Sequence, residues 1–234
     1  MDVGTLVLLH SPFARASTWG SLPASLRGRG HDVLVVDVDD DDHAPFAAAY
    51  VAQAALQISA ADPRMPLTLI GHSGAGPLLP QIGYAQRAAR RQVGAYLFLD
   101  SRLPRAGASR LDLMHDADEE AAHLVHDELA GGGLAPMWSD GDLTGSGLDP
   151  AQRAVVLAAA RPRGLAFFEE VLPHPGDWPD APCGYLQTSP GYAGSARVAR
   201  LHGFEVSSTS GGHLAALTEP ARLAQALIDL VTRL

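Results

Sequence analysis

The most informative segment of the sequence is Leu67-Thr-Leu-Ile-Gly71-His72-Ser73-Gly74-Ala75-Gly76. Its first four residues predict a strand buried on both faces, and the residues from Gly74 to Arg90 predict a helix. Between them, Ser73 has a small residue two positions before it and another two positions after it. A serine on a tight strand-to-helix turn needs that spacing, because larger side chains would collide there. We interpret the segment as a nucleophile elbow; the alternative is a glycine-rich turn without chemistry.

Apolar runs and helical patterns alternate along most of the chain. The predicted strands are 5–9, 33–36, 67–70, 93–99, 184–187 and 204–206. The predicted helices are 18–26, 45–60, 74–90, 196–201 and 219–234. Alternation of this kind implies an α/β fold with a mostly parallel sheet and helices on both faces. The pattern stops near Arg105 and resumes after Pro182, so we expect a single domain over 1–234 with a lid insertion at about 105–182.

A serine hydroxyl is a weak nucleophile and needs a base to activate it. His213 is the best candidate, because it follows Ser210-Gly211-Gly212 in a loop between the last predicted strand and the last predicted helix. A histidine flanked by glycines in a late loop can project into a site. The alternative is an ordinary surface histidine.

Three segments together resemble the α/β-hydrolase superfamily, in particular small bacterial members without the first antiparallel hairpin. They are Leu8-Leu-His10-Ser-Pro12, Gly71-His-Ser-Gly-Ala-Gly76 and Gly211-Gly-His-Leu-Ala215. The resemblance implies a helical lid after the strand at 93–99 and a catalytic triad in the order serine, acid, histidine. It also implies that Ser73 is the nucleophile and His213 the base.

The acid of the triad is absent from its most common place in this superfamily. No Asp or Glu occurs between Thr188 and Phe204. Asp100 ends the preceding predicted strand, and sites on open α/β sheets form at the carboxyl ends of strands. We therefore assign Asp100 as the acid, against the alternative of an Asp that caps a turn, and keep Glu169 and Glu170 in reserve.

The oxyanion hole is expected to use two backbone N–H groups, one of them from Gly74, the residue after the nucleophile. Family members often take the second from the loop after the first strand. That loop reads His10-Ser-Pro-Phe13 here, and Pro12 has no N–H to donate. We expect the second donor to be Phe13.

The insertion should supply an apolar substrate pocket. Its expected lining residues are Trp19, Met114, Met137, Trp138, Phe167, Phe168 and Trp178. The sequence thus predicts a serine hydrolase that acts on an ester, lactone or thioester of a small organic molecule. Two alternatives stay open: a non-hydrolytic catalyst of acyl transfer, cyclisation or carbon–carbon cleavage, and a protein that only binds a small molecule.

Composition excludes several other classes. The formal net charge of −9 argues against nucleic acid as a partner. Lysine and asparagine are both absent, which excludes a lysine Schiff base and a P-loop lysine, and the arginine-rich, lysine-free bias suggests a bacterial source. One cysteine allows neither a disulfide framework nor a cysteine-based zinc site. No apolar run is long enough for a membrane span or signal peptide, so we expect a cytoplasmic protein. We also expect that it needs no cofactor. Its oligomeric state stays open.

Two clusters could hold a metal ion, although we expect none. Asp37 and the run Asp39–Asp42 offer carboxylates, but such a run is more often a solvated loop. His115, His123 and His126 lie among acidic residues of the insertion, where solvated or packed histidines are the favoured interpretation over a zinc site.

Overall fold

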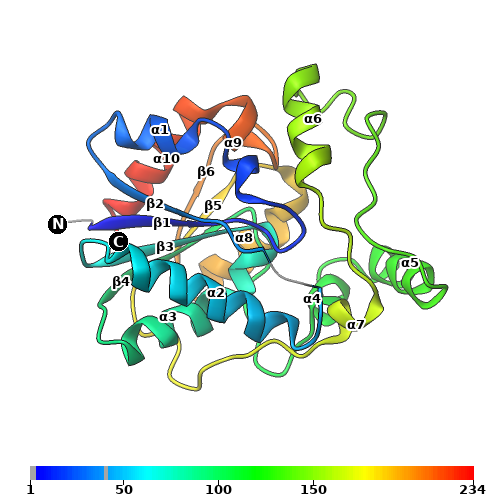
Figure 1. The fold of residues 1–234 in the computed structure, drawn as a ribbon, viewed down its shortest axis with the longest axis horizontal. Helices are drawn as coiled ribbons and strands as arrows, with labels where there is room; N and C mark the ends of the chain where they lie inside the picture. The colour runs from blue at the N-terminus through cyan, green and yellow to red at the C-terminus, as the bar shows by residue number, and fades with distance from the viewer. Residues whose placement is uncertain (1–3, 40–41) are drawn as a thin grey trace.

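The computed structural model describes residues 4–39 and 42–234. Within them, a six-stranded sheet has the order β2-β1-β3-β4-β5-β6, and every neighbouring pair is parallel (Figure 1). The strands are β1 (Thr5–Leu9), β2 (Asp32–Val36), β3 (Leu67–His72), β4 (Val93–Leu99), β5 (Cys183–Gln187) and β6 (Glu205–Ser208). The parallel α/β sheet predicted from the sequence is confirmed.

Helices cover both faces of the sheet because both faces of the central strands are apolar. Val7 and Leu9 of β1 face a core shared with α2 (Phe46–Ala61), α3 (Leu79–Ala88) and α8 (Ala193–Leu201). Leu6 and Leu8 face a second core shared with α1 (Leu22–Arg27), α9 (Ala215–Thr218) and α10 (Pro220–Val231). Figure 1 shows α2 and α3 below the sheet and α1 and α10 above it.

The strand order creates a switch point between β1 and β3. The chain leaves β1 for the edge strand β2 and then returns to the other side of β1. The loops that follow β1 and β3 therefore start side by side at the carboxyl ends of the strands, where open α/β sheets build their sites.

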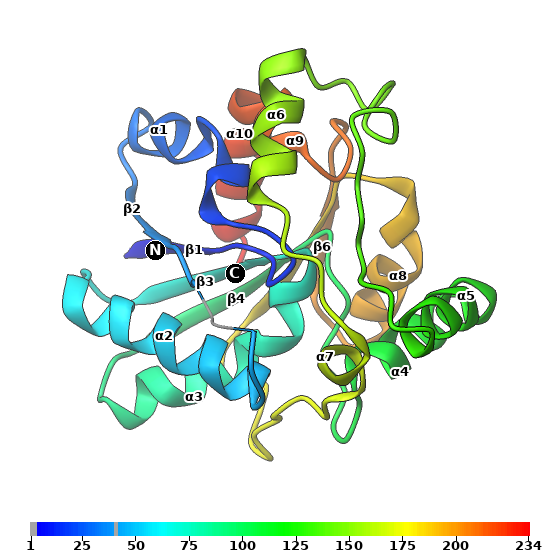
Figure 2. The same cartoon turned by 45° about the vertical axis from the view of Figure 1, so that its right-hand side comes forward.

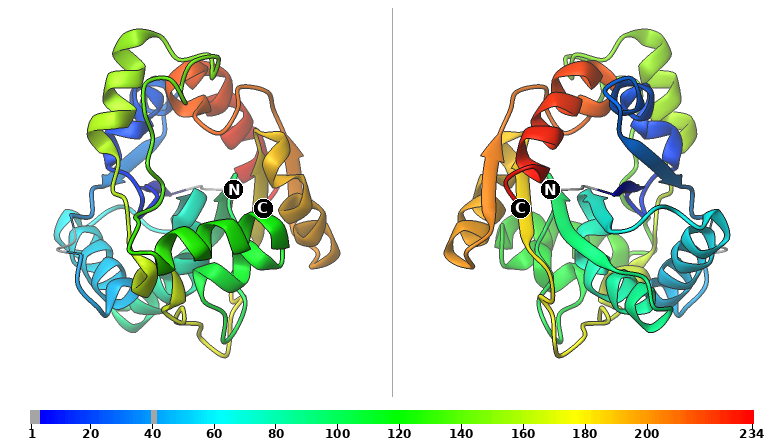
Figure 3. Two further views of the ribbon diagram at one scale, coloured as in Figure 1. Left: turned by 90° about the vertical axis from the view of Figure 1, so that its right-hand side faces the viewer. Right: turned by 90° about the vertical axis from the view of Figure 1, so that its left-hand side faces the viewer.

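Four helices between β4 and β5 lie at this same end of the sheet. They are α4 (Arg110–His115), α5 (Glu119–Ala130), α6 (Pro150–Ala159) and α7 (Leu165–Glu169). α4, α5 and α7 pack against one another, whereas α6 packs against the 3₁₀ turn Ala16–Trp19. Figure 2 and the left view of Figure 3 show α4, α5 and α7 grouped together and α6 apart from them. That this region acts as a lid stays a prediction.

Two predicted helices are interrupted by proline and glycine. The region 18–26 is a 3₁₀ turn ending at Trp19, then Gly20 with φ of 49°, then α1 with Pro23 in its first turn. The region 74–90 begins as the 3₁₀ turn Ser73–Leu78, and α3 starts only at Leu79. Pro77 has no N–H to donate, so a continuous α-helix cannot run through it.

None of the described helices is both long and apolar enough to span a bilayer.

Candidate active site

Ser73 occupies a strained turn between β3 and the helix that follows. Its φ is +55°, in the left-handed region that residues with a side chain rarely adopt. A Cβ on Gly71 would lie 2.9 Å from the Leu79 side chain, and one on Gly76 would lie 1.8 Å from the Ser101 hydroxyl. The Ser101 hydroxyl donates to the Ser73 carbonyl at 2.6 Å and so ties the turn to the end of β4. The elbow geometry predicted from the small residues is present.

His213 and Asp100 meet at the carboxyl ends of the strands, although 113 residues separate them in the sequence. The imidazole Nδ1 lies 3.3 Å from the Asp100 Oδ2, slightly beyond an ideal hydrogen bond. The reserve acid Glu170 lies elsewhere: it accepts from the Ala47 N–H at 2.7 Å and pairs with Arg110. Glu169 is exposed at the end of α7.

Asp100 is fully buried and held by donors from the segment that lacks acids. Its Oδ1 accepts from the N–H groups of Thr188 at 2.6 Å and Ser189 at 3.2 Å. Its Oδ2 accepts from the hydroxyls of the same two residues at 2.7 and 2.6 Å. Burial alone would raise the pKa of Asp100, but the hydrogen bonds from His213, Ser189 and Thr188 outweigh it and lower the pKa to about 2. Asp100 is therefore ionised across the physiological range and can orient an imidazole.

The rings of two side chains contact the His213 ring, and no pattern in the sequence points to either of them. The Tyr192 ring stacks on one face, with ring centres 5.0 Å apart and planes within 8°. The His72 ring lies 4.5 Å from that of His213, and its Nε2 lies 2.9 Å from the His213 carbonyl oxygen. Burial, and then the nearby His213, lower the pKa of His72 to about 3, so it is a neutral donor that fixes the loop.

Tyr192 also contacts the nucleophile. Burial raises the pKa of its phenol, and a hydrogen bond with the Ser73 side chain opposes that rise. Ser73 and His213 line the same cavity together, but among the described residues the serine hydroxyl has no hydrogen bond to the imidazole. Catalytic hydrogen bonds are often long before substrate binds, so this resting arrangement is compatible with the two residues acting as a pair.

The loop after β1 lies against the elbow. A Cβ on Gly74 would lie 3.1 Å from the Ser11 hydroxyl and 3.2 Å from the Phe13 ring. The Phe13 N–H, the donor expected in place of Pro12, points to the Ser11 Oγ at 3.3 Å. Arg163, between α6 and α7, donates to the Pro12 carbonyl at 2.9 Å and so ties the loop to the insertion.

A cavity of about 540 Å³ opens between the lid and the elbow. Of the side chains expected in a pocket, Met114, Met137, Trp138 and Phe168 line it. The other three pack elsewhere. Trp19 is buried against His72, Phe167 lies behind the wall against Phe13 and Phe46, and Trp178 packs on Tyr96, Phe98 and Phe204. Trp19 and Phe167 are buried, and Trp178 is half-buried against the core, so none of the three lines the cavity.

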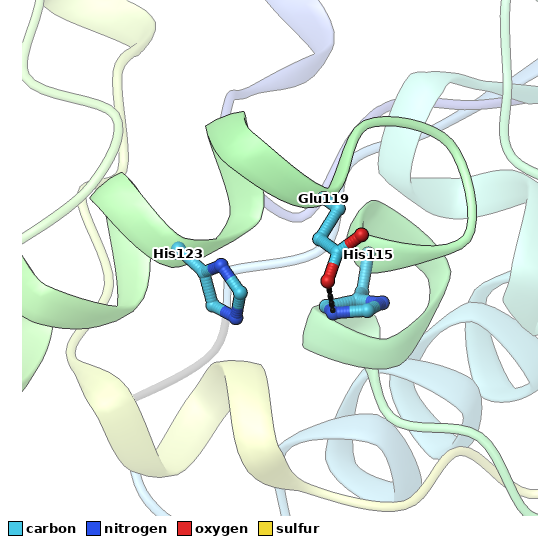
Figure 4. Close-up of side chains that lie close together, drawn as sticks. All are labelled: His115, Glu119 and His123. Carbon is cyan, nitrogen blue, oxygen red and sulfur yellow. Dashed lines mark ion pairs between the residues drawn. The ribbon is translucent and has the colours of Figure 1, made fainter.

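The metal-ligating clusters are separate from this cavity. In the acidic run, Asp39 pairs with Arg15 and Arg161, and Asp42 pairs with Arg163; Asp40 and Asp41 lie outside the described residues. His115, Glu119 and His123 present ligand atoms within 4.8 Å of one another on α4 and α5 (Figure 4). All three are exposed, and none lines the cavity with Ser73, while His126 faces Asp127. A metal at this cluster would therefore be bound by residues outside the lining of the cavity that holds Ser73.

Comparison with known proteins identifies the fold. No protein-family model matches the sequence. No curated protein matches it either. Among solved structures, the chain is similar to an extracellular α/β-hydrolase from a Paenibacillus species, described as sharing structural and functional homology with tobacco salicylic acid binding protein 2. The TM-score is 0.77 at 18% identity, and the match covers 97% of this chain and 98% of that one.

Two further solved structures agree. Tomato methylketone synthase I matches with a TM-score of 0.71 and 16% identity over 98% of each chain. Polyneuridine aldehyde esterase matches with a TM-score of 0.71 and 16% identity over 97% of this chain and 98% of that one. The protein therefore has the α/β-hydrolase fold. At these identities the similarities establish the fold but not the reaction, which depends on the residues of the site.

Proposed function

We propose that the protein is a serine hydrolase that cleaves an ester, lactone or thioester of a small organic molecule. The observation that carries this proposal is the contact of His213 with the buried, ionised Asp100 beside a serine on a strained elbow. Ser73 attacks the carbonyl, His213 takes its proton and returns it to the leaving group, and Asp100 holds the imidazole in the tautomer that leaves Nε2 free. The N–H groups of Gly74 and Phe13 stabilise the oxyanion.

The cavity supports a substrate of modest size with apolar parts. A volume of about 540 Å³ falls in the range of small-molecule sites. Met114, Met137, Trp138 and Phe168 offer apolar walls. A cytoplasmic location stays a prediction.

A second candidate, a non-hydrolytic reaction on the same fold, rests on one observation. The Phe13 N–H is already bonded to the Ser11 hydroxyl, so one oxyanion donor is occupied in the resting site. Ester hydrolysis must either break that hydrogen bond or proceed with an oxyanion hole that has one N–H donor fewer. The similarity to a methylketone synthase shows that the fold is also found in a protein named as a synthase.

Hydrolysis of p-nitrophenyl butyrate in ¹⁸O-enriched water tests the proposal. Wild-type protein should release acid that carries one heavy oxygen, and Ser73→Ala should lose several orders of magnitude in rate. Ser208→Ala, at an exposed residue of β6, is the matched control and should keep the wild-type rate. A Ser73→Ala variant that retains more than about a tenth of the rate would exclude covalent serine catalysis.

A further inference from the structure

An arginine without a carboxylate partner lies at the candidate active site. Arg102 comes two residues after Asp100 at the end of β4 and lines the same cavity as Ser73 and His213. Its side chain is half-buried. Among the residues that the structure describes, Arg102 makes no ion pair, whereas Arg87, Arg105 and Arg110 each face a carboxylate.

The guanidinium of Arg102 lies over an aromatic ring that also contacts the candidate base. It lies 5.1 Å from the centre of the Tyr192 ring, whose other neighbour is the His213 ring at 5.0 Å. These two lengths place the guanidinium within about 10 Å of the imidazole. Stacking uses the flat face of a guanidinium and leaves its in-plane N–H donors available for a bidentate acceptor.

The other charges of the cavity do not neutralise Arg102. Arg110 also lines the cavity, but it donates to the Phe167 carbonyl at 2.9 Å and faces Glu170 at 3.4 Å. Glu128 of α5 is exposed at the rim and forms no ion pair with Arg102. The remaining walls are largely apolar. Arg102 is half-buried, so water solvates part of its charge, and the part that faces this cavity has no carboxylate paired with it among the described residues.

We propose that the substrate carries a carboxylate that binds Arg102 while its ester, lactone or thioester carbonyl lies at Ser73. This inference rests on the proposed function and names its substrate class: a half-ester or thioester of a short dicarboxylic acid. Because the guanidinium lies no more than about 10 Å from the imidazole, a chain with about four to six bonds between the two carbonyl carbons can reach both groups. Binding energy from the remote carboxylate orients the reacting carbonyl.

Two esters that differ in one group test the proposal. p-Nitrophenyl hemiglutarate carries the carboxylate, and p-nitrophenyl 4-carbamoylbutanoate carries a neutral amide of nearly the same shape. We expect kcat/KM of the wild-type protein to favour the hemiglutarate at least tenfold. Arg102→Gln should lower that ratio by about 10- to 100-fold, since it removes a charge-assisted bidentate contact. Arg105→Gln, at an exposed arginine paired with Asp116, should keep the ratio.

A loss shared equally by both esters would mean that Arg102 only supports the Tyr192 stack, and it would overturn the proposal. A wild-type preference for the neutral ester would overturn it as well. A binding measurement separates failure here from failure of the proposed function. Calorimetric titration of Ser73→Ala with glutarate needs no turnover, and we expect saturable binding that Arg102→Gln in the same background weakens at least tenfold. No binding, or equal binding by both, would contradict the carboxylate site whether or not the esters are cleaved.

Discussion

Replacing Asp100 with asparagine should abolish most of the activity. The reason lies in the geometry of the five hydrogen bonds that the Asp100 carboxylate accepts. Oδ1 accepts from two backbone N–H groups, of Thr188 and Ser189, which cannot rotate away. The asparagine oxygen must therefore take this position, and its NH₂ group replaces Oδ2. The NH₂ then faces His213 Nδ1, which lies 3.3 Å from Oδ2 in the wild-type protein.

A donor at this place forces Nδ1 to accept and moves the imidazole proton to Nε2. The base that should take the Ser73 proton is then lost, and the charge that stabilises the imidazolium is lost with it. Other serine triads lose about 10⁴ in kcat from this change, equivalent to about 5 kcal/mol of transition-state stabilisation. The fold should lose about 1.5–3 kcal/mol from the missing charged acceptor.

The assay is steady-state hydrolysis of p-nitrophenyl butyrate, with circular dichroism to confirm that the variant is folded. Asp180→Asn is the matched control, because that carboxylate accepts from Tyr96 at 2.9 Å and pairs with Arg87 before β5, at the opposite end of the strands. The control should keep the wild-type kcat. A folded Asp100→Asn variant that loses less than tenfold would refute the assignment of Asp100.

Acid stability, protease sensitivity and metal dependence can each be measured on the same protein. The pKa of Asp100 is lowered from 3.8 to about 2, so its carboxylate should add about 2 kcal/mol to the free energy of unfolding above pH 4 and lose this contribution as the pH falls through 2. In urea titrations, the free energies of unfolding of wild type and Asp100→Asn should therefore converge on acidification, and a constant difference would contradict the shift. Limited proteolysis should cut first between Gly131 and Gly147, a largely exposed stretch without a described helix, and first cuts within the sheet would count against a mobile lid. Dialysis against EDTA should leave the esterase rate unchanged, since the His115, Glu119 and His123 cluster is separate from the cavity; a rate restored only by added Zn²⁺ would show a metal role.

The sequence predicted the framework because its signals are local. Gly71, Ser73 and Ala75 specify the elbow by spacing alone, and the apolar runs specify parallel strands. Asp100 could be selected because the region after β5 holds no acid, and the structure brings it to His213. The interruption of the helix after Ser73 was also local, in Pro77, but the periodicity of the surrounding residues concealed it.

What the sequence could not specify depends on contacts between distant residues. Tyr192 stacks on His213 from the 3₁₀ turn Pro190–Tyr192 before α8, and His72 contacts the His213 carbonyl across 141 residues. The tryptophans at 19 and 178 illustrate the reverse case, since aromatic character suggested a pocket while packing placed both in the core. That Arg102 forms no ion pair among the described residues depends on the positions of the surrounding carboxylates, which the sequence does not contain.

The most direct test of the account is labelling by a fluorophosphonate probe, followed by intact-mass measurement and peptide mapping. We expect one adduct per chain, located on Ser73, and labelling slowed about 10³-fold or more in His213→Ala, because the serine then lacks its base. An unlabelled wild-type protein, an adduct on another residue, or equal labelling of His213→Ala would contradict a serine nucleophile activated by His213.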